Sequence, residues 1–196
     1  ASDSYTPMAL AFGRIFFAAV VMLIYCLIRR VPSEAFGENW FMYATIGLVN
    51  LVLPFFFISY GIVKIQSNMA AILMSTAPIF AAILSHLFIQ DEKINLLKFV
   101  GILVGFLGII YLFSDDLLIN SSNIFYAFMV ILGPACYTLG GLFSLKLKHI
   151  KNEVLTSSIL VWAVIILLPI LFFFENPTEL RPTWGATVSL LYLGIV

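Results

Sequence analysis

Long apolar runs recur along the whole chain and constrain its fold more than any other feature. A helix crosses the hydrocarbon core of a membrane with about 20 largely apolar residues. These runs are apolar on all sides, whereas the strands of a membrane β-barrel alternate apolar and polar residues. We therefore predict an all-α, polytopic membrane helix bundle, with full spans at 7–28, 40–63, 69–89, 96–113, 124–145 and 155–174 and a cut span at 184–196.

The composition excludes the main soluble classes of protein. Of the 196 residues, 62% are hydrophobic and 10% are charged, with a mean hydropathy of +1.09. A soluble domain is near half apolar and about a quarter charged, so a soluble enzyme and a disordered tail are both excluded. The 10 basic and 10 acidic residues balance, which predicts no nucleic-acid partner. The first expected partner is the lipid bilayer.

The basic residues predict the orientation, because cytoplasmic loops of membrane proteins are enriched in lysine and arginine. If the links alternate between sides, the links 29–39, 90–98 and 146–153 carry most of the loop cations, while the other side holds only Lys64 and Arg181. We therefore expect these three links to be cytoplasmic, in a bacterial-type cytoplasmic membrane. The first visible helix then enters from outside, so we expect the chain to be a fragment with a helix before it.

The predicted spans contain helix-breaking prolines and small glycine residues. Pro54 and Pro78 each remove a backbone donor and are expected to kink their helices, either as static bends or as gates of a cavity. Gly101, Gly105 and Gly108 lie on one face of the fourth span. Such a stripe lets another helix approach closely, so we predict tight packing there, within the subunit or across a homodimer.

Arg14 is the most costly residue in the predicted spans. It lies about 10 Å along the first span at ~1.5 Å per residue. A charge at that depth must reach the interface, water or a partner. We predict that it faces the protein interior, with Phe12, Ile15, Phe16 and Met22 on the lipid side.

Uncharged polar residues within or near the spans complete the candidate cavity. Such groups either tie helices together or line a cavity, and the sequence leaves both readings open. Together with Arg14, the substrate-cavity candidates are Asn50, Tyr60, Ser75, Thr76 and Tyr137.

Catalytic motifs are absent from the sequence. It contains no HExxH, GxSxG or CxxC motif, no phosphate loop and no aspartate within a span. Cys26 and Cys136 lie inside apolar runs and are interpreted as packing residues. We therefore expect no enzyme activity, no metal and no cofactor.

Motifs in the first half resemble the EamA-type branch of the drug/metabolite transporter superfamily. That branch has a P-x-x-L-A-x-x-R helix, a P-[VIL]-[FW] element, a glutamate after the following span and a G-x6-G helix. The matching residues are Pro7, Leu10, Ala11, Arg14, Pro78, Glu92, Gly101 and Gly108. The resemblance gives Glu92 and the glycines structural roles, Glu92 at the turn between two helices.

The resemblance implies a ten-helix protein built from two five-helix repeats of opposite orientation. Residues 1–114 would then be helices two to five of the first repeat, and 115–196 helices six, seven and the start of eight. It also implies transport of a small organic solute, such as an amino acid, nucleobase or drug-like metabolite, by alternating access. The alternatives are a seven-helix receptor or sensor and a membrane scaffold that transports nothing.

Overall fold

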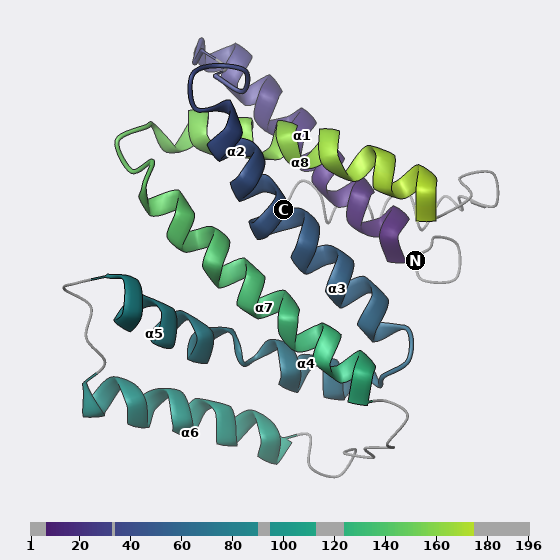
Figure 1. Ribbon diagram of the computed structural model, residues 1–196, viewed down its shortest axis with the longest axis vertical. Coiled ribbons are helices and arrows are strands. Elements are labelled where there is room, and N and C mark those ends of the chain that lie inside the picture. The colour runs from purple at the N-terminus through teal and green to yellow at the C-terminus, as the bar shows by residue number, and fades with distance from the viewer. Residues whose placement is uncertain (1–6, 33, 90–94, 113–123, 175–196) are drawn as a thin grey trace.

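The computed structural model describes residues 7–32, 34–89, 95–112 and 124–174. These residues form helices joined by short links (Figure 1). The helices are α1 (Pro7–Arg29), α2 (Trp40–Gly47), the π-helix η1 (Leu48–Val52), α3 (Leu53–Ile62), α4 (Ser67–Met74), α5 (Ala77–Phe88), α6 (Leu96–Leu112), α7 (Ile124–Leu145) and α8 (Asn152–Phe174). The six predicted full spans agree with them to within three residues at each end. The predicted span at 184–196 lies outside the described residues.

The described chain is an all-α membrane bundle. Five of its helical segments are long and apolar enough to cross a membrane, and the 17-residue α6 is a shorter apolar helix. Large apolar side chains cover the outside of the bundle, for example Leu97 at 81% exposure and Phe173 at 88%. Water would solvate these side chains poorly, whereas lipid tails cover them at no such cost.

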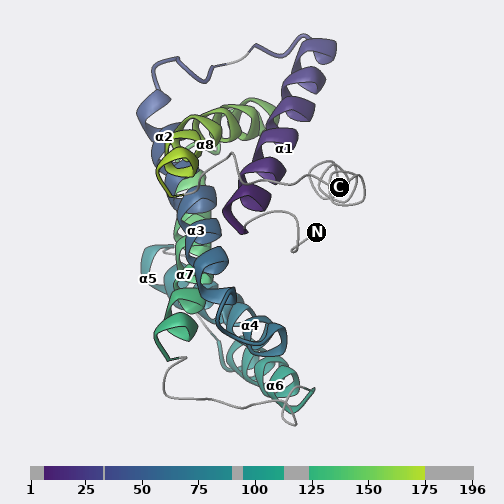
Figure 2. The ribbon, with the colours of Figure 1, turned by 90° about the vertical axis from the view of Figure 1, so that its right-hand side faces the viewer.

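The helices α3 and α7 form the centre of the bundle and run antiparallel. Gly61 near the end of α3 lies beside Tyr126 near the start of α7, and Asn50 in η1 lies beside Gly140. The pair α1 and α8 lies at one end of the molecule, and α6 lies at the other (Figures 1 and 2). The segment α4–α5 packs between α7 and α6.

Two apolar clusters hold α8 to the rest of the bundle. In the first, Met8 and Ile15 of α1 meet Val52 of η1 and Leu167 of α8. In the second, residues of α2 pack against Ile159 of α8 and the turn after α7. The prediction that Ile15 faces lipid is wrong, because it is 3% exposed and packs in the first cluster. Phe12, also predicted to face lipid, packs against the same cluster.

Both prolines that are predicted to kink their helices lie beside irregular backbone. Pro54 follows η1, in which the Leu53 N–H donates to the Leu48 carbonyl, five residues back. Pro78 lies at the start of α5, and the third span is broken into α4 and α5 at Ser75 and Thr76. Because a proline ring clashes with the carbonyl four residues earlier, a wider turn or a break relieves each site.

The glycines that pack closely differ from the predicted ones. A Cβ built on Gly101, Gly105 or Gly108 would meet nothing within 4 Å in the described part of the chain. The described helices therefore do not make the expected contact, which stays a prediction for a helix outside them. By contrast, a Cβ on Gly140 would lie 2.7 Å from the Cα of Asn50, and one on Gly47 would lie 3.0 Å from the carbonyl oxygen of Ile159.

The helix ends place most of the described basic link residues on one side of the bundle. The carboxyl ends of α1, α5 and α7 and the amino ends of α2, α6 and α8 lie on the same side of the bundle (Figure 1). Arg29, Arg30, Lys98, Lys146, Lys148 and Lys151 occupy these ends and links. Lys64 lies at the opposite side, after α3.

This arrangement predicts the labelling pattern of single cysteines in intact cells. With Cys26 and Cys136 replaced, an impermeant thiol reagent should miss cysteines placed in the links 30–39 and 146–151 and should label one placed at Gln66. Opening the cells should expose all three positions. Labelling of the first two links in intact cells, with position 66 protected, would reverse the orientation.

Candidate functional site

A cavity of about 340 Å³ lies between α1, α3, α7 and the break from α4 to α5. Such a volume is at the lower end of the range for small-molecule sites, about 300–1,000 Å³. Its lining is apolar apart from two side chains, Arg14 of α1 and Tyr137 of α7. The described residues that line it are Arg14, Pro54, Phe55, Ile58, Met74, Ala77, Gly133, Pro134 and Tyr137.

Irregular backbone or a helix-internal proline borders this cavity on three sides. Pro54 follows the π-helix, Met74 and Ala77 flank the break between α4 and α5, and Pro134 lies inside α7. A proline without an N–H leaves an earlier carbonyl without its helical donor. In a membrane, such backbone is tolerated where it is buried in protein or lines a cavity.

Among the described residues that line the cavity, Arg14 alone carries a charge. Its guanidinium carbon lies 5.7 Å from the centre of the Phe55 ring, which is within the range of a cation–π interaction. The Tyr137 side chain, 54% exposed, lines the same cavity from α7. The cavity therefore combines one fixed cation, one phenol and an apolar wall.

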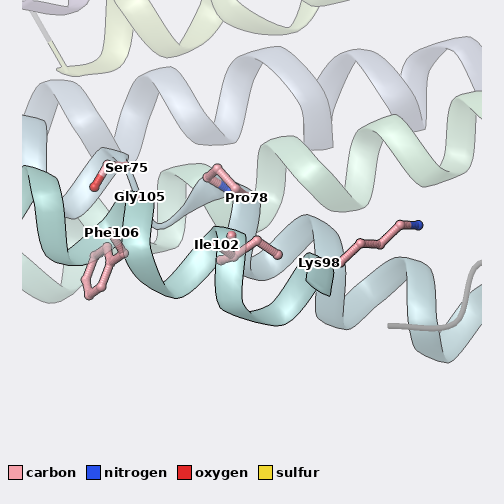
Figure 3. Close-up of a pocket in the computed structure, with 7 residues that line it drawn as sticks. Ser75, Pro78, Lys98, Ile102, Gly105 and Phe106 are labelled. Atoms are coloured by element: carbon pink, nitrogen blue, oxygen red, sulfur yellow. The ribbon is translucent and has the colours of Figure 1, made fainter. Parts of the chain in front are cut away.

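A second cavity, of about 440 Å³, lies between the α4–α5 segment and α6 (Figure 3). It brings together four of the predicted residues, Ser75, Pro78, Gly101 and Gly105, with Lys98 at one end. The Ser75 hydroxyl donates to the Ile72 carbonyl at 2.6 Å, so it is already bonded within its own helix. The glycine face expected to pack against a helix is therefore one wall of this groove.

The remaining polar candidates do not line either cavity. The side-chain oxygen of Asn50 is buried beside Gly140 and has no hydrogen-bond partner among the described residues. Tyr60 stacks on Phe56 with ring centres 6.1 Å apart. The Thr76 hydroxyl donates to the Leu73 carbonyl at 2.6 Å. Glu92 lies outside the described residues.

Sequence reasoning missed several residues of the first cavity. The Gly133-Pro134 pair inside a predicted span was the available signal, since both residues loosen a helix. Gly133 and Gly140 also repeat the spacing of Gly101 and Gly108, and it is this second pair that packs closely. No feature of the sequence marks Phe55 as a cavity residue, because it is one of several phenylalanines in an apolar run.

The described side chains offer no group of three His, Cys, Asp or Glu residues that could hold a metal ion. The cavity can hold a solute by charge, by a hydrogen bond from a phenol and by apolar contact.

Comparison with protein families gives a match over the first part of the chain. Residues 1–114 match the EamA-like transporter family. The matched range contains α1 to α6 and thus one side of the cavity, while α7 supplies the other.

Curated relatives and a solved structure extend over more of the chain. The uncharacterized transporter YoaV of Bacillus subtilis is 27% identical over 97% of the chain, and an uncharacterized transporter of Archaeoglobus fulgidus is 33% identical over 76%. The uncharacterized inner membrane transporter YedA of Escherichia coli is 28% identical over 74%. The chain spans 65%, 52% and 46% of these three relatives.

A solved crystal structure matches 99% of the chain and 67% of its own with a TM-score of 0.83, at 16% sequence identity. This similarity shows that the two chains share a fold. The family match covers more than half of the chain, and the apolar helices are those of a membrane protein. The chain therefore belongs to the EamA-like transporter family and is an integral protein of the cytoplasmic membrane.

Proposed function

We propose that the full-length protein moves a small organic solute across the membrane by alternating access, through the cavity between α1, α3 and α7. The observation that carries this proposal is the cavity itself. It is lined by one cation and one phenol in an apolar wall, and Pro54, Pro134 and the α4–α5 break adjoin it. Ion and solute sites of transporters are often built from such interrupted helices. The names of the relatives, which call them transporters, support the same activity.

The proposed mechanism is a rocking of two repeats about the cavity, with the breaks beside Pro54 and Pro78 serving as gates. The resemblance assigns α1 and α8 to equivalent positions in the two repeats. These two helices pack against each other and run antiparallel, since Met8 meets Leu167 and Cys26 lies beside Glu153. Repeats of opposite orientation would produce such a pair. Transport of this kind needs no cofactor.

A receptor or sensor with a bound ligand, and a scaffold without one, are the rival functions. They are separated from a transporter by one measurement, the movement of a solute across a sealed membrane. We therefore choose uptake and efflux of a solute panel by vesicles that contain the full-length protein. Transport of at least one class above empty vesicles supports the proposal, and its absence across the panel contradicts it.

A variant that fills the cavity links transport to this site. Ala77 lines the cavity at the start of α5. Ala77→Phe is expected to lower transport by at least about tenfold, the factor equivalent to ~1.4 kcal/mol. Ala81→Phe, one turn further along α5 at an exposed position, is the matched control and should transport normally. Equal transport by both variants would place the route elsewhere.

A further inference from the structure

The charge balance of the cavity is incomplete within the described residues. Arg14 supplies a positive charge to a lining that contains no carboxylate. The Phe55 ring makes a cation–π contact with the Arg14 guanidinium but carries no negative charge. An arginine keeps its charge in proteins, so the cavity cannot become neutral by releasing a proton.

The described carboxylates lie far from Arg14, at the other end of α1. Glu34 accepts a hydrogen bond from the Tyr43 hydroxyl at 3.5 Å. Glu153 lies beside Cys26, whose thiol is 3.9 Å from the Glu153 carbonyl oxygen. Cys26 is twelve residues beyond Arg14, or about 18 Å along the helix at ~1.5 Å per residue. Glu38 lies in the same link as Glu34. Among the described residues, none is therefore placed to neutralise Arg14.

A cation held at an apolar cavity is stabilised when an anion binds beside it. Arg14 is exposed among the described residues, so its planar guanidinium is free to donate two parallel hydrogen bonds to a carboxylate. Tyr137 lines the same cavity and has a hydroxyl that can donate a further hydrogen bond.

From this charge balance, and on the basis of the proposed function, we infer that the transported solute is a monoanion, with a carboxylate bound at Arg14 and an apolar body in the rest of the cavity. One negative charge cancels the one positive charge of the lining. A doubly charged phosphate would leave a surplus negative charge, and an amine would place a second cation beside Arg14. The apolar body would contact Phe55, Ile58 and Met74.

The test compares ligands of the same shape and different charge on the purified full-length protein. The probes are phenylacetate, benzoate and hexanoate, each paired with its uncharged amide, together with phenethylamine. Binding is measured as ligand-induced thermal stabilisation, from which an affinity follows. The wild-type protein is expected to bind each carboxylate at least about tenfold more tightly than its amide, the factor that corresponds to ~1.4 kcal/mol.

Variants then assign this preference to one residue. In Arg14→Gln the ratio of the carboxylate to the amide affinity should fall to about one, and in Arg14→Lys it should fall less. The matched control is Arg29→Gln, because Arg29 lies on the same helix with its guanidinium carbon also 5.7 Å from a ring centre, that of Tyr25. The control should keep the wild-type ratio. Because each ratio is measured within one variant, a general loss of stability cancels.

Each outcome decides between this inference and the proposed function. Equal or weaker binding of the carboxylates by the wild-type protein, or no binding of any probe, overturns the inference even if Arg14→Gln cannot be purified. A carboxylate preference that survives in Arg14→Gln also overturns it. A preference that depends on Arg14, in a protein whose vesicles transport none of the carboxylates, supports the anion site and removes the proposed transport. Transport of neutral solutes without any carboxylate preference supports the proposed transport and removes the anion site.

Discussion

Replacement of Gly140 by leucine should prevent the full-length protein from folding normally. A Cβ at this position would lie 2.7 Å from the Cα of Asn50 and 2.8 Å from its backbone nitrogen. These are backbone atoms of η1, so no rotation of a side chain can relieve the clash, and α7 must move away from η1. We expect destabilisation of about 3 kcal/mol or more, at the upper end of the range for overpacked cores.

The neighbouring glycine provides a matched control in the same helix. A Cβ on Gly141 meets nothing within 4 Å in the described part of the chain. Gly141→Leu should therefore be neutral or slightly stabilising, because leucine favours a helix by about 0.5–1 kcal/mol over glycine. The measurement is unfolding of both purified variants in denaturing detergent, with the monodisperse fraction from gel filtration. Equal stability of the two variants would contradict the close approach of α7 to η1.

Arg14→Lys should lower transport by at least about tenfold in vesicles that contain normal amounts of protein. Lysine keeps the charge but loses the planar fork of donors, and it stacks less well over an aromatic ring such as Phe55. If Arg14 merely reached the membrane interface, lysine would do so equally well, because both side chains have long apolar stems. The substitution therefore separates a cavity residue from an interfacial one.

The control for this prediction is the same change at the end of the same helix. Arg29→Lys keeps a cation at the helix terminus and leaves the cavity lining unaltered, since Arg29 is exposed and lies outside it. Transport by Arg29→Lys should equal that of the wild type. Unimpaired transport by a well-expressed Arg14→Lys variant would show that Arg14 acts at the membrane interface and not in the cavity.

The helix boundaries were predictable because they depend on local properties of the chain. A membrane imposes a minimum length on each apolar run, and polar links must lie outside it. The predicted span at 124–145 therefore coincides with α7, and the one at 40–63 with the segment from α2 to α3. The same holds for the irregular backbone beside Pro54 and Pro78, since the loss of a backbone donor is a property of the proline itself.

The faces of the helices were harder to predict. In a soluble protein, the buried face of a helix is apolar and the exposed face is polar, so the period of the sequence separates them. Lipid tails are as apolar as a protein interior, and the contrast disappears. The sequence therefore predicts that Ile15 faces lipid, although it packs in the core. It also predicts for the stripe from Gly101 to Gly108 a close contact that the described helices do not make.

The sequence by itself thus determined that the chain is a bundle of membrane helices, where most of these helices begin and end, and which of their ends are basic. It also marked Arg14 as a costly residue that needs a partner. Only the tertiary structure placed Phe55 and Tyr137 around the same cavity as Arg14 and put Asn50 against Gly140. The physical reason is that these neighbours come from different helices, and their proximity depends on how the helices cross, which an apolar sequence does not encode in its period.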